Sequence, residues 1–393
     1  MSNSTSTTKN KNHVYDYIVI GAGLTGLTIA AALSKKTKNV LLLEGADHSG
    51  GSNRPIAFPT GDINNGLRLI PNTESSQQAL LFLENILNLK LIKGELQAPV
   101  LTYENSQLKS FLGFKDEAPD FYEELAYFIH ASRLQLNIEP RQWPQLLLEK
   151  FEGEFSSRSY VTKFITEGEQ VTGVMVNGTK TIHAQNFIFC GTVKDLAILV
   201  PEDSLGAKHK HKLSKGRYWS AINLDLCHNH SVTDSESVHL LNGTTQDDIG
   251  PCAGLFLPAV EKDGSAFQTS QWVTFIDTES SEESELIANA LKKVKRQIKR
   301  AYPEAIENLV TERIFISPII GGHGELKLSG DQSLPKLKNL WIGSPVMNLQ
   351  KNLVGSLQQS QMILTALGFD DFSVSNEELS SDFVTNQNLE SSL

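Results

Sequence analysis

Residues 15–44 read YDYIVIGAGLTGLTIAAALSKKTKNVLLLE, and this stretch decides the fold of the chain. Its first apolar run, Tyr17–Ile20, contains β-branched residues and predicts a buried strand. The small, apolar segment Leu27–Ser34 predicts a buried helix, and Val40–Leu43 predicts a second strand. A strand, a glycine-rich turn, a helix and a strand in this order are typical of a Rossmann-like nucleotide-binding unit.

Three glycines with G-x-G-x-x-G spacing connect the first strand to the helix. Gly21 permits the tight turn, Gly23 lets the backbone approach a diphosphate, and Gly26 lets the helix pack closely on the sheet. The helix N-terminus, with Leu24 and Thr25, offers free N–H groups and partial positive charge to the same diphosphate. A glycine-rich turn alone is often only a loop, so this interpretation depends on the strands and helix around it.

Glu44 ends the second predicted strand and lies 44 − 26 = 18 residues after the last glycine of the motif. This is close to the ~20 residues expected for an acid that accepts a hydrogen bond from a ribose hydroxyl. The small residues that follow, from Gly45 through the pair Gly50–Gly51, predict a loop along the cofactor. A plain surface turn is the alternative for this loop. The whole stretch predicts dinucleotide binding.

Length and composition indicate a globular protein with two domains, since 393 residues can bury a large core. A hydrophobic content of 40% and a charged content of 20% fit this class. The formal net charge of −10 disfavours a nucleic-acid partner, because phosphate contacts require a basic surface. Cys190, Cys227 and Cys252 have no C-x-x-C spacing, so we expect packing residues in a reducing compartment and no zinc site.

The most apolar stretch, Ile18–Leu33, is shorter than the ~20 residues of a membrane span and is interrupted by the three glycines. Residues 1–13 are Ser, Thr, Asn and Lys without an apolar core, so we expect a disordered tail, no secretory signal and a cytoplasmic protein. Residues 369–393 are acidic and rich in Ser and Asn, which predicts a second disordered tail. We expect no integral membrane segment.

The remaining pattern predicts helices at residues 75–89, 119–136, 143–151 and 280–301, the last opened by a capping box at Ser280–Glu283. Asn177–Gly178 predicts the turn of a hairpin, and Leu337–Ile342 predicts a strand before a helix at 354–367. Several histidines lie between residues 209 and 239, but no acid or cysteine accompanies them at a ligand spacing, so we expect no metal site.

The glycine motif, the acid Glu44 and a glycine pair with a nearby arginine resemble the flavin-containing amine oxidases and their relatives, the phytoene desaturases and protoporphyrinogen oxidases. In that superfamily an arginine follows the glycine pair directly. Here Ser52 holds that place and Arg54 follows two residues later. The resemblance implies that Ser52 and Arg54 lie near the diphosphate of FAD.

The resemblance also assigns cofactor contacts later in the chain. It implies that the backbone of Val161 reads the adenine edge and that Gly191 ends the strand returning to the nucleotide domain. In the family the last strand ends in Gly-Asp, and the Asp binds a ribityl hydroxyl; here Gly343 is followed by Ser344, whose hydroxyl can also bond a sugar hydroxyl. The N–H groups of Leu353 and Val354 are expected to meet the flavin.

We therefore expect an α/β protein with a Rossmann-like FAD-binding domain and a sequence-discontinuous α+β substrate domain. FAD is favoured over NAD by the Gly50–Gly51 loop, by the single dinucleotide motif and by the glycine-ended strand and helix that return near the end of the chain. No cysteine follows Cys252, so we expect FAD without a thioether bond. The expected FAD-binding domain comprises residues 14–62, 140–210 and 320–368, and the expected substrate domain comprises residues 63–139 and 211–319.

The predicted function is FAD-dependent oxidoreduction, with a hydride taken from a small-molecule substrate by amine oxidation or C–C desaturation. The glycine-flanked His323 is the candidate catalytic residue, because a histidine can move the substrate proton near neutral pH. A flexible glycine turn with an exposed histidine is the alternative, and we favour it slightly. The alternative for the whole chain is a non-catalytic dinucleotide-binding scaffold or a subunit of a larger enzyme, which leaves a protein partner open.

Overall fold

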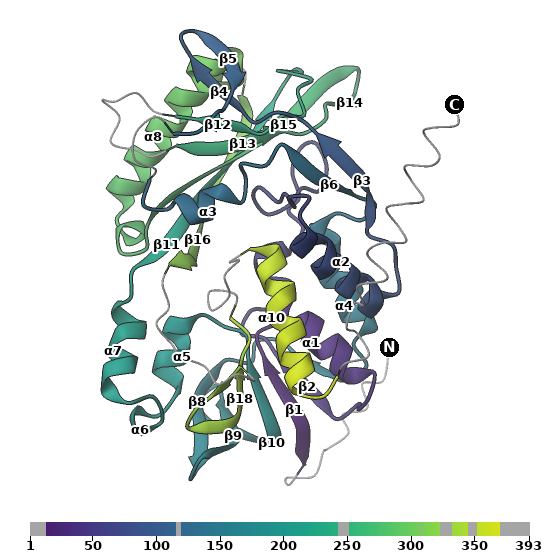
Figure 1. The fold of residues 1–393 in the computed structure, drawn as a ribbon, viewed down its shortest axis with the longest axis vertical. Helices are drawn as coiled ribbons and strands as arrows, with labels where there is room; N and C mark the ends of the chain where they lie inside the picture. The colour runs from purple at the N-terminus through teal and green to yellow at the C-terminus, as the bar shows by residue number, and fades with distance from the viewer. Residues whose placement is uncertain are drawn as a thin grey trace.

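The computed structural model describes residues 13–114, 119–242, 251–307, 309–322, 332–344 and 352–369. Two large sheets, one below the other in Figure 1, are built from alternating parts of the chain. The lower sheet takes its strands from residues 14–43, 154–189 and 333–342, and the upper sheet from residues 101–110, 218–277 and 309–322. The expected fold class, a Rossmann-like domain with a second, sequence-discontinuous domain, is confirmed.

The lower sheet has the order β17-β18-β10-β1-β2-β7, and the pairs β18–β10, β10–β1, β1–β2 and β2–β7 are parallel. Strand β9 pairs antiparallel to β10 across the predicted Asn177–Gly178 turn, and β8 pairs antiparallel to β9. Its strands are β1 (Val14–Ile20), β2 (Val40–Leu43), β7 (Glu154–Ser156), β8 (Val161–Glu167), β9 (Gln170–Val176), β10 (Lys180–Phe189), β17 (Ser333–Leu334) and β18 (Leu337–Ile342).

Both faces of the central strands are covered, which is why their sequences are continuously apolar. Val19 and Leu42 pack beneath a layer of helices, whereas Ile18 and Leu41 pack against the opposite layer. The first layer consists of α1 (Leu24–Ser34), α2 (Glu74–Leu87), α4 (Trp143–Lys150) and α10 (Leu353–Ala366). The second contains β8, β9, α5 (Val193–Leu199), α6 (Glu202–Leu205) and α7 (Ala207–Lys215).

The upper sheet has the order β16-β11-β15-β13-β12-β4-β5 and is antiparallel except for the β12–β4 pair. Leu224 and Trp272 face α8, whereas Ala221 and Val273 face the interior between the sheets. The elements are β4 (Leu101–Glu104), β5 (Gln107–Ser110), β11 (Tyr218–His228), β12 (His239–Leu241), β13 (Cys252–Phe256), β14 (Val260–Lys262), β15 (Ser265–Asp277), β16 (Leu309–Gly322), α8 (Ser284–Ala301) and α9 (Glu304–Glu307).

Two predicted helices differ from the structure. The segment predicted as one helix from 119 to 136 forms the short α3 (Tyr122–Ala126) and then the strand β6 (Ser132–Leu136), because β6 pairs with β3 (Ile92–Gln97). The predicted capping box is also wrong. Residues Ser280–Glu282 form a 3₁₀ turn, and Ser281 Oγ donates to Thr278 O at 2.7 Å instead of capping α8. The other helices and strands named above are confirmed within a few residues.

The two terminal predictions can be compared only at their inner edges. His13 lies in the described part and contacts Asn39, and Phe369 is buried against Tyr17, while disorder of the two tails stays a prediction. Residues 1–12 and 370–393 lie outside the described residues.

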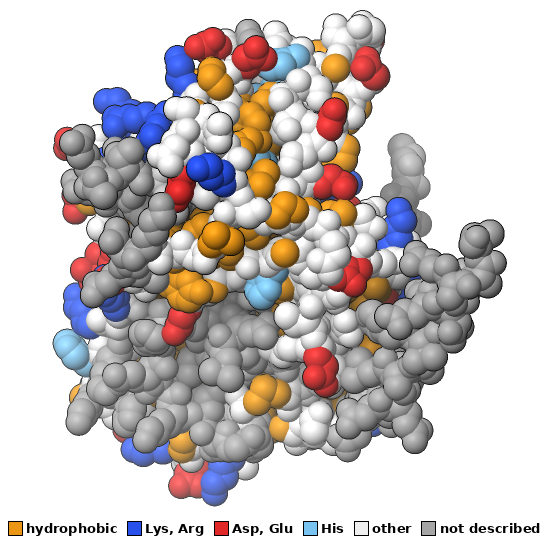
Figure 2. Space-filling model, turned by 45° about the horizontal axis from the view of Figure 1, so that its top comes forward, with side chains coloured by type: hydrophobic (Ala, Val, Ile, Leu, Met, Phe, Trp, Pro, Cys, Tyr) orange, Lys and Arg blue, Asp and Glu red, His pale blue; other side chains and the backbone are white. Residues whose placement is uncertain are grey.

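Among the described residues, no helix combines the length and hydrophobicity that crossing a bilayer requires. On the face shown in Figure 2, basic and acidic side chains are interspersed on both sides of a band of hydrophobic ones.

Candidate functional site

The turn between β1 and α1 has the geometry that its glycines predict. Gly21 has φ +100°, a conformation that favours glycine. A Cβ on Gly26 would lie 1.9 Å from the carbonyl oxygen of Gly21, so only glycine allows this packing of α1. A Cβ on Gly23 would meet no atom within 4 Å, and Gly23 caps α1 without any side-chain hydrogen bond. Gly23 therefore leaves the start of α1 without a capping side chain.

The Gly50–Gly51 loop lies directly against this turn. The N–H of Gly50 donates to Ala22 O at 2.7 Å, and a Cβ on Gly51 would come within 3.2 Å of the Cα of Gly23. Both loop glycines have positive φ, 104° and 53°. The two glycine segments thus form a main-chain cradle beside the α1 N-terminus, and a diphosphate fits its donor groups and its lack of side chains.

Glu44 lies at the end of β2 and holds the two loops by hydrogen bonds to main-chain N–H groups. Its Oε2 accepts from Ala22 N at 2.7 Å, and its Oε1 accepts from Ala46 N at 2.8 Å. A carboxylate has about four acceptor sites, so two remain for other donors such as ribose hydroxyls. The ring of Tyr160 covers Gly45 and is itself 63% exposed, and Val161 follows it at the start of β8.

The ends of β10 and β18 meet near the N-terminus of α10. Gly343 donates to Phe189 O at 2.7 Å, and a Cβ there would lie 2.6 Å from the Sγ of Cys190. Burial raises the pKa of the Cys190 thiol, which therefore stays protonated. Asn352 caps α10 by accepting from Val354 N at 2.9 Å and from Gly355 N at 3.2 Å. The N–H of Val354, expected to meet the flavin, is thus already bonded within the chain.

A cavity of about 870 Å³ extends from these strand ends to the upper sheet. Near the lower sheet its wall includes four predicted residues and the helix cap: Ser52, Arg54, Gly191, Ser344 and Asn352. Near the upper sheet its wall is largely apolar: Leu67, Ala221, Val273, Phe275, Phe315 and Ile316. Segments α3 and α5 close its sides with Glu123, Glu124, Tyr127, His130 and Asp195. The volume is that of a small-molecule site.

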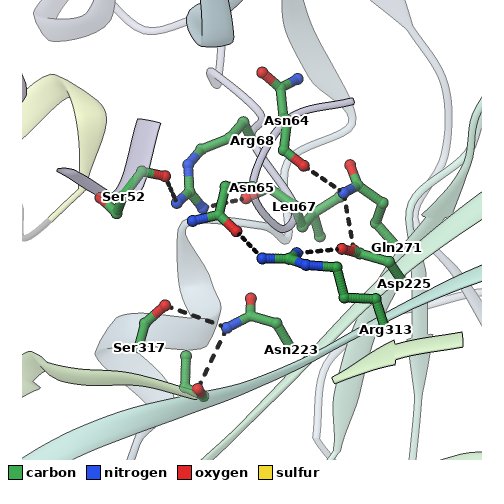
Figure 3. Close-up of polar contacts among 11 residues, drawn as sticks. Ser52, Asn64, Asn65, Leu67, Arg68, Asn223, Asp225, Gln271, Arg313 and Ser317 are labelled. Atoms are coloured by element: carbon green, nitrogen blue, oxygen red, sulfur yellow. Dashed lines mark hydrogen bonds and ion pairs between the residues drawn. The ribbon is translucent and has the colours of Figure 1, made fainter. Parts of the chain in front are cut away.

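A polar network from the upper sheet reaches the cavity (Figure 3). Asp225 on β11 is fully buried and lies opposite Arg313 on β16 and Gln271 on β15 in the strand register. Arg313 Nη1 donates to Asp225 Oδ2 at 2.8 Å, and Gln271 Nε2 donates to Asp225 Oδ1 at 2.9 Å. Burial raises the pKa of Asp225, while the hydrogen bonds from Gln271 and Arg313 oppose that rise.

The same network holds the segment 64–68 against the sheet. Arg313 Nη2 donates to Asn65 Oδ1 at 2.6 Å, and Gln271 Nε2 also donates to Asn64 O at 2.9 Å. Arg68 then points back to the glycine loop, donating to Ser52 O at 2.9 Å and to Asn53 Oδ1 at 3.1 Å. Figure 3 shows Asn65 between the two arginines. The segment therefore links the main-chain cradle to the upper sheet.

The structure gathers many of the predicted site residues and leaves others apart. Leu353 lines the cavity with the four named above, while Arg54 turns its Nη1 to His48. Thr25 lies in the buried first turn of α1, and Val161 lies beyond Tyr160 on β8, outside the cavity wall. The candidate catalytic His323 lies outside the described residues.

Among the cavity residues that sequence analysis missed, four carry polar groups of interest: Arg68, Tyr127, Asn223 and Arg313. A signal existed for one of them. In the predicted strand Ala221–Leu226, polar residues alternate with leucines at Asn223 and Asp225, which places both polar side chains on one face. Arg68 and Tyr127 follow no pattern of this kind, because their place in the cavity depends on how distant segments pack.

Comparison with known proteins shows the fold. The family model of the NAD(P)-binding Rossmann-like domain matches residues 19–86. An oxidoreductase structure from Methanosarcina mazei has a TM-score of 0.67 at 14% identity and covers 89% of this chain and 99% of its own. Putrescine oxidase bound to putrescine has a TM-score of 0.61 at 13% identity, with 91% and 99% covered.

Reduced UDP-galactopyranose mutase is also similar, with a TM-score of 0.64 at 12% identity and with 92% of this chain and 98% of its own covered. A search of curated proteins found no match. The chain therefore shares the fold of these structures over about nine-tenths of its length.

Proposed function

We propose that this protein is an FAD-dependent oxidoreductase that takes a hydride from a small organic substrate bound in the 870 Å³ cavity. The observation that carries the proposal is the main-chain cradle in which Gly51 packs against Gly23 at the N-terminus of α1, where no side chain caps the helix. The cavity begins at Ser52, directly after this cradle. The similarity to oxidoreductase structures supports the same assignment.

The residues present can hold FAD along its length. Glu44 keeps two acceptor sites for the adenosine ribose, and the α1 N-terminus with Gly23 offers N–H groups to the diphosphate. Ser344 and Leu353 in the cavity wall would contact the ring end. A bound flavin supplies the acceptor for a hydride, whereas the protein supplies binding, orientation and exclusion of water.

The cavity walls are suited to exclude water from the substrate. Val273, Phe275 and Phe315 present apolar surface, and Phe315 also supports the guanidinium of Arg313, which lies 3.9 Å from the ring centre. Polar groups in such a site act in a low dielectric and orient a substrate more strongly than in water. His323 stays a candidate for handling the substrate proton, and amine oxidation or C–C desaturation is the proposed reaction.

We also propose the domain ranges given above, since the two sheets draw on the same alternating parts of the chain.

Cytoplasmic location is proposed on the cysteines: Cys190, Cys227 and Cys252 are free thiols. No group of three potential metal ligands occurs within the part of the chain that the structure describes. The proposed cofactor is FAD.

A glycine pair tests the proposal. Gly23→Ala and Gly94→Ala each add a methyl group into open space without backbone strain, but only Gly23 lies at the α1 N-terminus. We expect Gly23→Ala to lower the FAD content of the purified protein at least about tenfold, because the backbone no longer approaches a diphosphate. Gly94→Ala should keep the parental FAD content, and the FAD-free forms of the parent and both variants should melt at the same temperature.

Absorbance spectra and chromatography of the cofactor released by acid provide the measurement. A purified parent protein without FAD that also fails to take it up would contradict the proposal and favour a scaffold protein. Equal FAD content in the parent and Gly23→Ala would remove the glycine turn from the site.

A further inference from the structure

Arg68 differs from the other arginine of the polar network in its partners. Arg313 is paired with the carboxylate of Asp225 at 2.8 Å. Arg68 donates to three neutral oxygens, those of Ser52 O, Asn53 Oδ1 and Leu67 O, at 2.9, 3.1 and 3.0 Å. Within the described residues it forms no ion pair. Asp225 is hydrogen-bonded to Arg313 and acts on Arg68 only through its charge, so one carboxylate is shared between the two arginines of the network.

Arg68 remains charged in this position. Burial lowers its pKa to about 10, which still leaves the guanidinium protonated at neutral pH. A guanidinium has five N–H donors, and the three bonds named above leave two for a ligand. A charge that is taken out of water without a counterion is costly, and an anion bound beside it removes part of that cost.

Tyr127 adds a donor at the same place. Its hydroxyl is buried and has no hydrogen-bond partner among the described residues, although its side chain lines the cavity. Burial raises the pKa of Tyr127 and the nearby charge of Arg68 opposes that rise, so the two groups interact while the hydroxyl stays protonated. Arg68 and Tyr127 together present N–H and O–H donors to one part of the cavity.

The acidic residues of the cavity wall belong to other elements. Glu123 and Glu124 come from α3 and Asp195 from α5. Glu124 accepts from the N–H of Gly322 at 3.1 Å, and Asp195 accepts from Thr192 Oγ1 at 2.6 Å. Neither of these two carboxylates is bonded to Arg68. The wall near Arg68 also includes the polar Asn65 and Arg313, and apolar surface comes from Leu67, Phe275 and Phe315.

We propose that Arg68 and Tyr127 form an anion subsite, and that the substrate is an organic carboxylate with an apolar body. A guanidinium binds a carboxylate by charge-assisted hydrogen bonds, and the apolar wall accommodates the remainder of such a molecule. The assignment of this ligand as the substrate rests on the proposed function. An anionic group of the bound cofactor is the other source of the same chemistry, and the experiment below separates the two.

The probe is phenylacetate, compared with its neutral amide, phenylacetamide, by isothermal titration calorimetry on the purified full-length protein. We expect the parent to bind phenylacetate at least about tenfold more tightly than the amide. In Arg68→Gln this preference should disappear. Arg217→Gln removes an equal charge from an exposed arginine outside the cavity and should keep the preference.

A second variant keeps the test decisive where Arg68→Gln fails to fold. Tyr127→Phe removes only the hydroxyl and should weaken phenylacetate binding about threefold without changing the affinity for the amide. A parent without preference for the carboxylate would overturn the proposal, and so would variants that retain the parental preference.

FAD content is measured on the same samples. Loss of FAD in Arg68→Gln, together with a parent that does not prefer phenylacetate, would assign the charge of Arg68 to the cofactor and overturn the substrate assignment. A parent without FAD whose carboxylate preference depends on Arg68 would contradict the proposed function and leave the anion subsite in place.

Discussion

The two sheets serve the site by different chemistry. The parallel sheet contributes main-chain groups at the ends of apolar strands, as at Gly21–Gly23 and Gly343. The antiparallel sheet contributes buried side chains from the middle of its strands, including Asn223, Asp225 and Gln271. A main-chain site suits a cofactor that many proteins share. A side-chain site can be changed residue by residue, so the antiparallel sheet is where we expect substrate specificity.

The largest expected effect concerns the parallel sheet, where α1 packs closely at Gly26. A methyl group in Gly26→Ala would lie 1.9 Å from Gly21 O, and backbone cannot move aside as a flexible side chain can. We expect the free energy of unfolding to fall by about 3 kcal/mol or more. Urea unfolding measures it, with Gly94→Ala as the control that adds a methyl group in open space. A stable Gly26→Ala protein would mean that α1 packs differently on the sheet.

The next effect concerns the buried ion pair on the side-chain side. Asp225→Asn leaves Arg313 without its counterion, and we expect a loss of about 2–3 kcal/mol, reduced because Arg313 is 23% exposed. Glu152→Gln removes a carboxylate from an exposed ion pair with Lys38 and should change stability little. The double variant Asp225→Asn/Arg313→Met should recover part of the loss. Additive losses in that cycle would contradict a direct interaction.

Buried histidines make the antiparallel half sensitive to pH. Burial lowers the pKa of His228 and of His239 to about 4, below the ~6.5 of an unfolded chain. Between pH 6.5 and 4 the unfolded chain therefore binds protons that the folded protein does not, and stability decreases as the pH falls. We expect a loss of about 2 kcal/mol for each histidine by pH 5.

Urea unfolding at pH 7, 6 and 5 measures this dependence. His183 on the parallel sheet is exposed and bonded to Thr172 O, and it provides the matched control. His239→Gln should reduce the slope with pH, whereas His183→Gln should not. Equal slopes in the two variants would show that the buried histidines do not cause the pH dependence.

The smallest expected effect on stability concerns Glu44, whose bonds to the two loops can be distinguished from its proposed bond to the cofactor. Glu44→Ala removes two hydrogen bonds to partly exposed N–H groups, and we expect a loss of about 1 kcal/mol. The same change should lower FAD content at least about tenfold, since the ribose loses its acceptor. As a control, Glu154→Ala on β7 removes the acceptor of the Tyr15 hydroxyl on β1. This variant should keep FAD. Unchanged FAD in Glu44→Ala would restrict Glu44 to its structural role.

The sequence was sufficient for the parallel half because its signals are local. The spacing of Gly21, Gly23 and Gly26 and the apolar runs on either side reflect steric limits within a single strand–turn–helix unit. The hairpin at Asn177–Gly178 is likewise a property of its own turn. The failure at residues 119–136 shows the limit. Its stripe of apolar residues fits a helix, but pairing with β3 makes its end a strand.

By itself the sequence determined the Rossmann-like strand–turn–helix–strand unit, the position of Glu44 and the alternation of two sheets along the chain. Only the tertiary structure decided which side chains share the cavity. Arg313 and Asn65, 248 residues apart, meet because the register of β11 and β16 places Arg313 opposite Asp225. Among the described residues Arg68 bonds no carboxylate, because the oxygens of Asp225 accept from Arg313 and Gln271 instead. Main-chain recognition depends on a short stretch of backbone, whereas a buried charge depends on every segment that surrounds it.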